Sequence, residues 1–272
     1  MSTPAEHLTG TGPAKDPVRT GSAGRLLSLG RAEWTLLARN KSALSTSLAL
    51  PVAMAFAMKG AAGHVGPAGS GLSPETLLLP AALGYVLLFA VYSTLTGAYV
   101  ARREELVLKR LRTGEPADRE ILAGTALPFV VLGLVQCAVL VVLGDVVLHA
   151  GPPRAPLSLV AGVLLGTVLV VALAAACSSL AGSTEAAQLV VLPLMLLSMA
   201  GSGIVAPLEA FPGRVATVLE LLPLSPVMEL IRAGWTGGAD AGRTLSHLAV
   251  AAVWIALALV AVRRWFRWEP RR

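Results

Sequence analysis

The chain has 272 residues, of which 55% are hydrophobic and only 14% are charged. Its mean hydropathy of +0.71 is too high for a soluble protein of this length and is typical of a polytopic membrane protein. The net charge of +6 does not indicate nucleic-acid binding, because no basic patch is interleaved with exposed aromatic residues.

The N-terminal region divides into a polar tail and an amphipathic segment. Residues 1–23 are rich in Pro, Gly, Ser and Thr and lack the apolar stretch of a signal peptide, so we expect a flexible cytoplasmic tail. Over residues 24–42, leucines alternate with charged residues around Trp34. This pattern predicts a helix in the cytoplasmic interface with Trp34 at headgroup depth. A simple flank of the first span explains the pattern equally well.

Six apolar stretches are long enough to cross the hydrocarbon core as helices. They are residues 43–58, 77–100, 125–148, 157–181, 188–207 and 245–262. The first is the weakest because it is short and contains Pro51. Continuous runs of Leu, Val and Ala without alternation favour helices over a β-barrel. We therefore expect an all-α transmembrane domain over residues 43–262.

Lys and Arg residues orient these spans. Six precede the first span, six lie between the second and third, and five form a basic tail at residues 263–272, against five in the remaining loops. This partition follows the positive-inside rule with both termini in the cytoplasm. We expect a multi-pass protein of the cell membrane, plasma or inner.

A charged insert, ARREELVLKRLRTGEPADREILAG at residues 101–124, separates the second and third spans. Apolar residues recur in it at helical spacing, which predicts a short amphipathic helix over about residues 101–119. Two membrane spans hold this helix at the cytoplasmic face, where a soluble partner can push on it. The charged residues that we expect to serve that contact are Glu104, Glu105, Lys109, Arg110, Arg112 and Arg119.

Small residues mark a packing site in the fourth span. Gly162 and Gly166 form a G-x-x-x-G arrangement, which we interpret as close helix packing inside the subunit rather than dimerisation. Cys137 and Cys177 lie in different spans without C-x-x-C spacing and are interpreted as small apolar residues.

The connection over residues 209–238 is too polar to span the membrane but carries two apolar pieces separated by prolines. It predicts an extracellular re-entrant helical hairpin that dips into the outer leaflet, since covered backbone breaks are tolerated at membrane depth. Ser225 or Pro226 is expected to begin the second helix. On that helix, Glu229 and Arg232 are three residues apart, and we interpret them as a local ion pair rather than a substrate contact. The residues that define this segment are Pro223, Pro226, Glu229 and Arg232.

The order of these elements resembles the ABC-2 type permease subunits of ATP-binding-cassette exporters. KRLRTGEPADREILAG at residues 109–124 resembles the coupling region of that family, and LPLSPVMELIRAGWTG at residues 222–237 resembles its segment before the final span. The likeness extends from about Arg25 to the C-terminus. It departs from the family at residues 114–116, where Gly-Glu-Pro replaces a simpler Thr-Pro.

The resemblance implies a half-transporter in which two permease chains form the pathway and two separate ATPase chains lie beneath them. The chain has no G-x-x-x-x-G-K-[ST] motif, so we expect it to hydrolyse no ATP itself, to hold no cofactor, and to leave ATP and Mg to the partner ATPase. The expected permease is a homodimer in contact with membrane lipid, although a heterodimer stays open. Its expected function is export of an amphiphilic or hydrophobic substrate such as a drug, antibiotic, lipid or lipid-linked glycan.

In that family the second and fifth spans line the exporter cavity. Tyr85, Tyr92 and Tyr99 recur every seven residues, which places them on one face of a straight α-helix. Interface anchoring explains Tyr85 and Tyr99 without a substrate, so a pathway role for Tyr92 stays open. The candidate pathway residues of the two spans are Tyr85, Tyr92, Ser93, Thr96, Ser198, Met199 and Ser202.

Two other classes of function stay open. A secondary transporter driven by protons or sodium needs an ionisable group near the midplane, whereas Asp145, Glu185 and Glu209 lie at span ends. A membrane scaffold or immunity protein binds a partner without transport, and polar residues in the pathway spans weigh against it. An ATPase gene beside this gene would distinguish the exporter from both.

Overall fold

The structure, a computed structural model, describes residues 22–39, 74–112, 117–202, 212–238, 240–266 and 268–269, with parts of 45–60. Every regular element in these residues is a helix, which confirms the all-α fold. Half of the predicted first span, residues 43–58, lies outside them.

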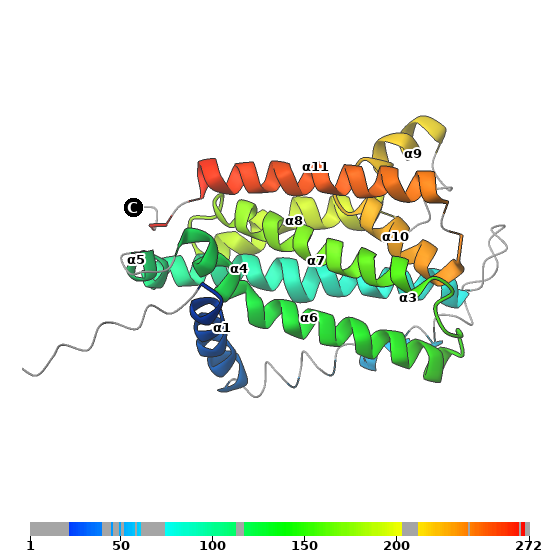
Figure 1. The fold of residues 1–272 in the computed structure, drawn as a ribbon, viewed down its shortest axis with the longest axis horizontal. Coiled ribbons are helices and arrows are strands. Elements are labelled where there is room, and N and C mark those ends of the chain that lie inside the picture. Colours follow the sequence, from blue (N-terminus) through cyan, green and yellow to red (C-terminus); the bar gives the residue numbers. More distant parts are fainter. Residues whose placement is uncertain are drawn as a thin grey trace, which may run out of the picture.

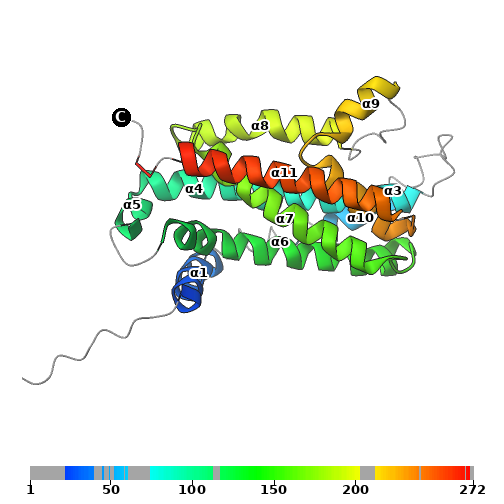
Figure 2. The same ribbon diagram turned by 45° about the horizontal axis from the view of Figure 1, so that its top comes forward.

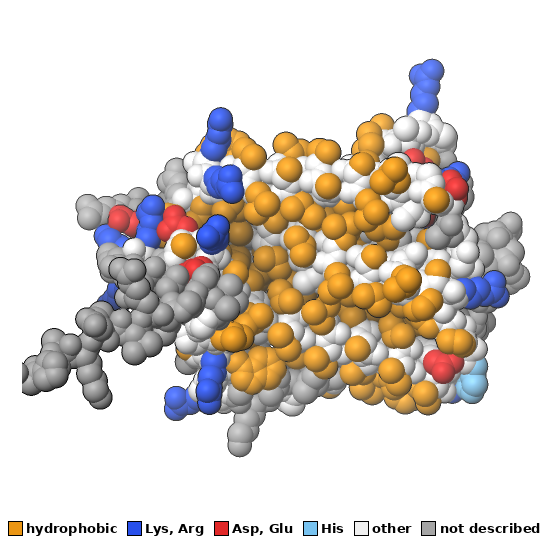
Figure 3. Space-filling model, viewed as in Figure 1, with side chains coloured by type: hydrophobic (Ala, Val, Ile, Leu, Met, Phe, Trp, Pro, Cys, Tyr) orange, Lys and Arg blue, Asp and Glu red, His pale blue; other side chains and the backbone are white. Residues whose placement is uncertain are grey.

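Five helical stretches among the described residues are long and apolar enough to cross a membrane. They lie side by side in one bundle (Figure 1). Exposed Val and Leu side chains form a broad apolar surface over its middle, while charged side chains gather near its ends (Figure 3). The chain is therefore a multi-pass membrane protein. The spanning elements are α3–η1–α4 (Pro74–Tyr85, Val86–Ser93 and Thr94–Glu104), α6 (Asp118–Leu148), α7 (Pro156–Ser178), α8 (Thr184–Gly201) and α11 (Ala241–Trp265).

The segments that the charge pattern assigns to the cytoplasm lie together. Helix α1 (Ser22–Arg39), α5 (Val107–Arg112) and the C-terminal end of α11 lie at one end of the bundle, which we call the α5 end (Figures 1 and 2). The start of α3 lies at the opposite end. The count of six spans stays a prediction.

The second span is not a uniform α-helix. Residues Val86–Ser93 form the π-helix η1, whose i→i+5 bonds put more than 3.6 residues in each turn. A seven-residue spacing therefore does not return Tyr85 and Tyr92 to one face, and the expected common face is wrong for Tyr85. The ring of Tyr85 is half-buried and stacks on Phe89 with 5.3 Å between centroids, whereas Tyr92 is fully buried.

Helix α10 (Ser225–Thr236) packs along α7 through glycines on both helices. A Cβ atom at Gly162 would lie 2.9 Å from the Ile231 side chain, and one at Gly234 would lie 2.5 Å from the Leu159 backbone nitrogen. Since real Cβ contacts are longer than these, only glycine allows the two backbones to approach so closely. The interpretation of the G-x-x-x-G arrangement as packing inside the subunit is confirmed.

The proline-rich connection contains two helices, as expected. Helix α9 (Gly213–Glu220) is exposed, whereas α10 is buried over most of its length. Ser225 begins α10, with Pro226 in its first turn. The hydroxyl groups of Ser225 and Ser202 lie 3.2 Å apart, which joins the end of α8 to the start of α10. How deeply this hairpin enters the membrane stays a prediction.

Candidate functional site

The segment predicted as one helix over residues 101–119 is divided in the structure. Helix α4 ends at Glu104, residues 105–106 form a turn, α5 covers Val107–Arg112, and α6 begins at Asp118. Leu106 has a φ of 59°, a left-handed conformation that an α-helix cannot continue and that costs a non-glycine residue about 1–2 kcal/mol. The single helix is therefore corrected to a turn and the short helix α5.

Helix α5 presents charge outward and one apolar anchor inward. Leu108 is fully buried, while Lys109, Arg110 and Arg112 are exposed. Glu104 and Glu105, just before the turn, are exposed as well. We call these five charged residues the coupling surface.

Arg119 lies apart from the coupling surface. It is exposed in the first turn of α6, because α6 begins seven residues before the third span predicted at residues 125–148. It therefore belongs to a membrane-spanning helix rather than to α5.

The described C-terminal residues fold back against α5, a contact that the sequence pattern did not predict. Phe266 packs edge-on against Tyr99 and Trp268, with centroid separations of 6.3 and 4.9 Å. The Arg112 guanidinium carbon lies 5.0 Å from the Trp268 ring centroid, within cation–π range. Lys109 Nζ lies 2.9 Å from Glu269 Oε1. The sequence RRWFRW contains three aromatic residues. A solvated basic tail rarely contains so many, so these residues were the available signal that the C-terminal segment packs against the protein.

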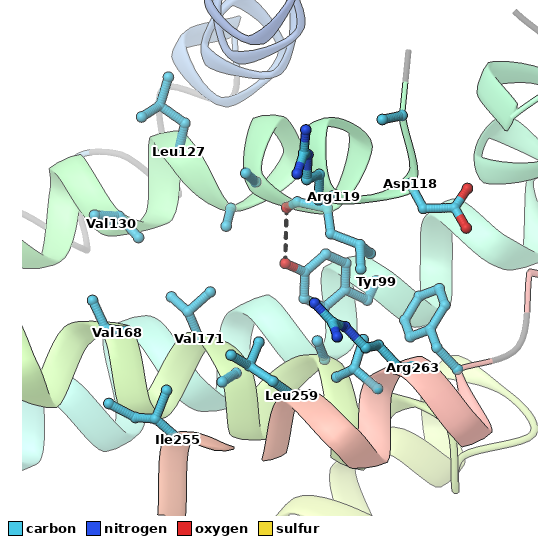
Figure 4. Close-up of a pocket in the computed structure, with 18 of the residues that line it drawn as sticks. Tyr99, Asp118, Arg119, Leu127, Val130, Val168, Val171, Ile255, Leu259 and Arg263 are labelled. Atoms are coloured by element: carbon cyan, nitrogen blue, oxygen red, sulfur yellow. Dashed lines mark hydrogen bonds between the residues drawn. The ribbon is translucent and has the colours of Figure 1, made fainter. Parts of the chain in front are cut away.

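A cavity of about 920 Å³ lies at the α5 end, between α6, α7, α11 and the end of α4 (Figure 4). Its walls are mainly aliphatic. Where polar groups face it, they are bonded within the protein: the Tyr99 hydroxyl donates to the Leu122 carbonyl at 2.9 Å, and the Thr167 hydroxyl donates to the Val163 carbonyl at 2.8 Å. The charged residues that line it are Arg112, Asp118, Arg119 and Arg263.

The family model described as ABC-2 family transporter protein matches residues 68–262. The match covers more than half of the chain and includes the coupling surface, α10 and the residues that line the cavity, except Arg263, Phe266 and Trp268. The chain belongs to the ABC-2 family of transporters. Permeases of this family are membrane transport components that are not themselves catalytic, and membership implies work with a separate ATP-binding subunit. None of the curated proteins compared with it matches.

The candidate pathway residues of the permease lie mostly inside the single chain. Tyr92, Thr96, Ser198 and Ser202 are buried, and Tyr85, Ser93 and Met199 are half-buried. None of these seven lines the cavity. Their role in a transport pathway stays a prediction.

The hydroxyl groups of Thr96 and Tyr92 differ in their contacts. The Thr96 hydroxyl donates to the Tyr92 carbonyl at 2.7 Å. The Tyr92 hydroxyl faces the Cys177 thiol and has no hydrogen-bond partner among the described residues.

In the segment of the permease that is predicted to be re-entrant, Glu229 and Arg232 form the predicted ion pair on α10. Because the two side chains neutralise each other beside the buried face of α10, the pair needs no substrate to explain it.

Arg103 is the structural residue of the permease that sequence reasoning missed. It is buried, and its guanidinium donates to the carbonyl oxygens of Ser178 at 3.0 Å and Ala181 at 2.5 Å. These carbonyls follow the last turn of α7, where backbone acceptors lack intrahelical donors and favour a cation. Arg103 therefore ties α4 to the end of α7. Sequence alone shows only one more arginine in a basic insert.

Proposed function

We propose that the permease forms the transmembrane part of an ATP-driven exporter that moves an amphiphilic or hydrophobic substrate out of the cell. The observation that carries this proposal is the coupling surface. Its basic residues lie on α5, a helix anchored by Leu108 at the same end of the bundle as α1 and the end of α11. In the proposed orientation this end faces the cytoplasm, where a separate ATPase binds ATP and Mg. Two permease chains, as a homodimer, assemble with two ATPase chains.

The contacts of α5 provide a route from ATPase to membrane. A displacement of α5 is transmitted to α4 through the strained turn at Leu106. Backbone strain of this kind is characteristic of switch regions. It reaches α11 through Trp268 and Phe266, which adjoin Arg112 and Tyr99. Closure of the ATPase dimer would thereby move spans as rigid bodies.

Charge reversal on α5 tests this proposal. We expect Lys109→Glu, Arg110→Glu and Arg112→Glu together to lower the amount of ATPase that co-purifies with the permease at least tenfold, because several charge-assisted contacts are lost. Permease level in the membrane should change little. The co-purified partner should contain G-x-x-x-x-G-K-[ST] and should match the permease in number.

Two controls separate ATPase binding from the internal ion pairs of α5. Glu269→Gln removes the partner of Lys109, and Asp118→Asn removes the carboxylate 3.3 Å from Arg112; both leave the charges of α5 unchanged and should retain the ATPase. Reversal at Arg214, exposed on α9, should also have no effect.

Normal ATPase retention by the triple variant would remove α5 from the mechanism. Substrate movement in liposomes under a proton or sodium gradient without nucleotide would instead establish a secondary transporter.

A further inference from the structure

The cavity at the α5 end has the dimensions of one membrane leaflet. Its wall extends along α6 from Arg119 to Val130 and along α11 from Arg263 back to Ile255. At a rise of 1.5 Å per residue these stretches are about 16 and 12 Å long. Half of the hydrocarbon core is about 15 Å thick. The cavity therefore reaches from the membrane surface to about the midplane.

The two ends of this cavity differ in chemistry. Away from α5 it presents aliphatic side chains, with Val168 and Leu259 exposed to 53% and 49%. Because the hydroxyls of Tyr99 and Thr167 already donate to backbone carbonyls, the wall offers an occupant little beyond apolar contact. Such a wall suits an acyl chain.

The mouth of the cavity carries an excess of positive charge. Arg112 forms an ion pair with Asp118 at 3.3 Å and a cation–π contact with the Trp268 ring. Arg119 on α6 and Arg263 on α11 lie on opposite sides of the opening (Figure 4), both exposed, and neither forms an ion pair within the described part of the chain. Guanidinium groups bind phosphate oxygens in bidentate geometry.

We propose that this cavity is a binding site for an anionic phospholipid of the leaflet at the α5 end, with its phosphate between Arg119 and Arg263 and an acyl chain along Val168, Ile255 and Leu259. Charge complementarity favours an anionic lipid over a zwitterionic one, because the charged residues that line the cavity are three arginines and one carboxylate, Asp118. In the proposed orientation the leaflet is the cytoplasmic one, which carries anionic lipid. The site lies within one chain and requires neither ATPase nor nucleotide, so it goes beyond the proposed export.

Lipid retention by the purified full-length permease tests the site. Equal amounts of dioleoyl phosphatidylglycerol and dioleoyl phosphatidylcholine are added in detergent, and retained lipid is counted by native mass spectrometry. We expect phosphatidylglycerol to be retained preferentially. Arg119→Gln with Arg263→Gln should lower its retention about tenfold, because two phosphate contacts are lost. Arg264→Gln, the same change at an exposed neighbour outside the cavity, should retain it like the unaltered protein.

A second pair of variants tests the acyl-chain part. Val168→Trp fills the cavity, whereas Leu164→Trp, one turn away with 49% exposure, does not line it. Val168→Trp should lower retention of phosphatidylglycerol several-fold and Leu164→Trp should not. Equal retention of the two lipids, an equal loss in Arg264→Gln, or normal retention in Val168→Trp would each overturn the proposal. An unchanged unfolding temperature in all variants excludes misfolding as the cause of a loss.

Discussion

Arg103 and its neighbour Arg102 show how differently two adjacent arginines act at the residue scale. Arg103 is buried against the end of α7, whereas Arg102 pairs with the exposed Glu105 at 2.9 Å. A buried donor that satisfies two carbonyl oxygens is expensive to remove because the acceptors stay buried. An ion pair with an exposed carboxylate three residues away contributes little.

Replacement of Arg103 should therefore destabilise the permease strongly. We expect Arg103→Ala to lower the free energy of unfolding by about 3 kcal/mol, since hydrogen bonds to a charged group contribute about 1.5–3 kcal/mol each and do not add fully. The matched change Arg102→Ala should cost about 0–1 kcal/mol. Thermal unfolding of both variants in detergent measures the difference. Equal unfolding temperatures would show that the α4–α7 contact does not stabilise the fold.

Tyr92 and Tyr99 give a second matched pair. The Tyr92 hydroxyl is buried without a hydrogen-bond partner among the described residues, while the Tyr99 hydroxyl donates to Leu122. Tyr92→Phe should leave the unfolding temperature unchanged or raise it, because an unsatisfied polar group is removed. Tyr99→Phe should destabilise by about 1 kcal/mol. A loss of stability in Tyr92→Phe would contradict this prediction. Loss of export without loss of stability would support the pathway role of Tyr92.

At the scale of elements, the sequence predicts what depends on local composition. Apolar runs predicted the spans now seen as α3–η1–α4, α6, α7, α8 and α11. Gly162 predicted close helix packing inside the subunit, which the structure places between α7 and α10. The predicted helix boundaries were wrong where the backbone leaves the α-helical conformation without a Gly or Pro residue to indicate it. Leu106 takes a left-handed conformation inside an unbroken amphipathic pattern, and the π-helix η1 has the same apolar composition as an α-helix. The contact between Trp268 and α5 depends on tertiary packing and has no local signature.

The C-terminal contact should stabilise α5 in its observed position. Trp268→Ala removes the aromatic ring beside Arg112, and a cation–π contact contributes about 0.5–1 kcal/mol at exposed sites. Amide hydrogen exchange in α5 should therefore become about two- to fivefold faster, following that free energy, while exchange in the buried helix α10 stays unchanged. Trp265→Ala, at a ring that is 67% exposed, is the control. Unchanged exchange in α5 would show that Trp268 does not support it.

At the scale of the whole molecule, the segments that the charge pattern assigns to the cytoplasm are also neighbours in space. Residues of α1, α5 and the end of α11 come from three distant parts of the sequence, yet the structure gathers them at one end of the bundle (Figures 1 and 2). They contain eight of the 22 Lys and Arg residues, and Arg102, Arg103 and Arg119 lie at the adjoining ends of α4 and α6. The opposite end carries α9 and the start of α11, which Gly238 precedes by three residues, and basic residues are few there. The positive-inside rule therefore predicts that the α5 end faces the cytoplasm.

Cysteine labelling in intact cells tests this orientation. After Cys137 and Cys177 are replaced by Ala, a cysteine introduced at Arg112 should resist a membrane-impermeant thiol reagent, whereas one at Gly238 should react. Both positions are exposed in the structure, so a difference between them reports the side of the membrane rather than burial. Permeabilised cells provide the positive control, because the cysteine at Arg112 should then react as well. Labelling at Arg112 in intact cells, with protection at Gly238, would invert the topology and place the coupling surface where no cytoplasmic ATPase could reach it.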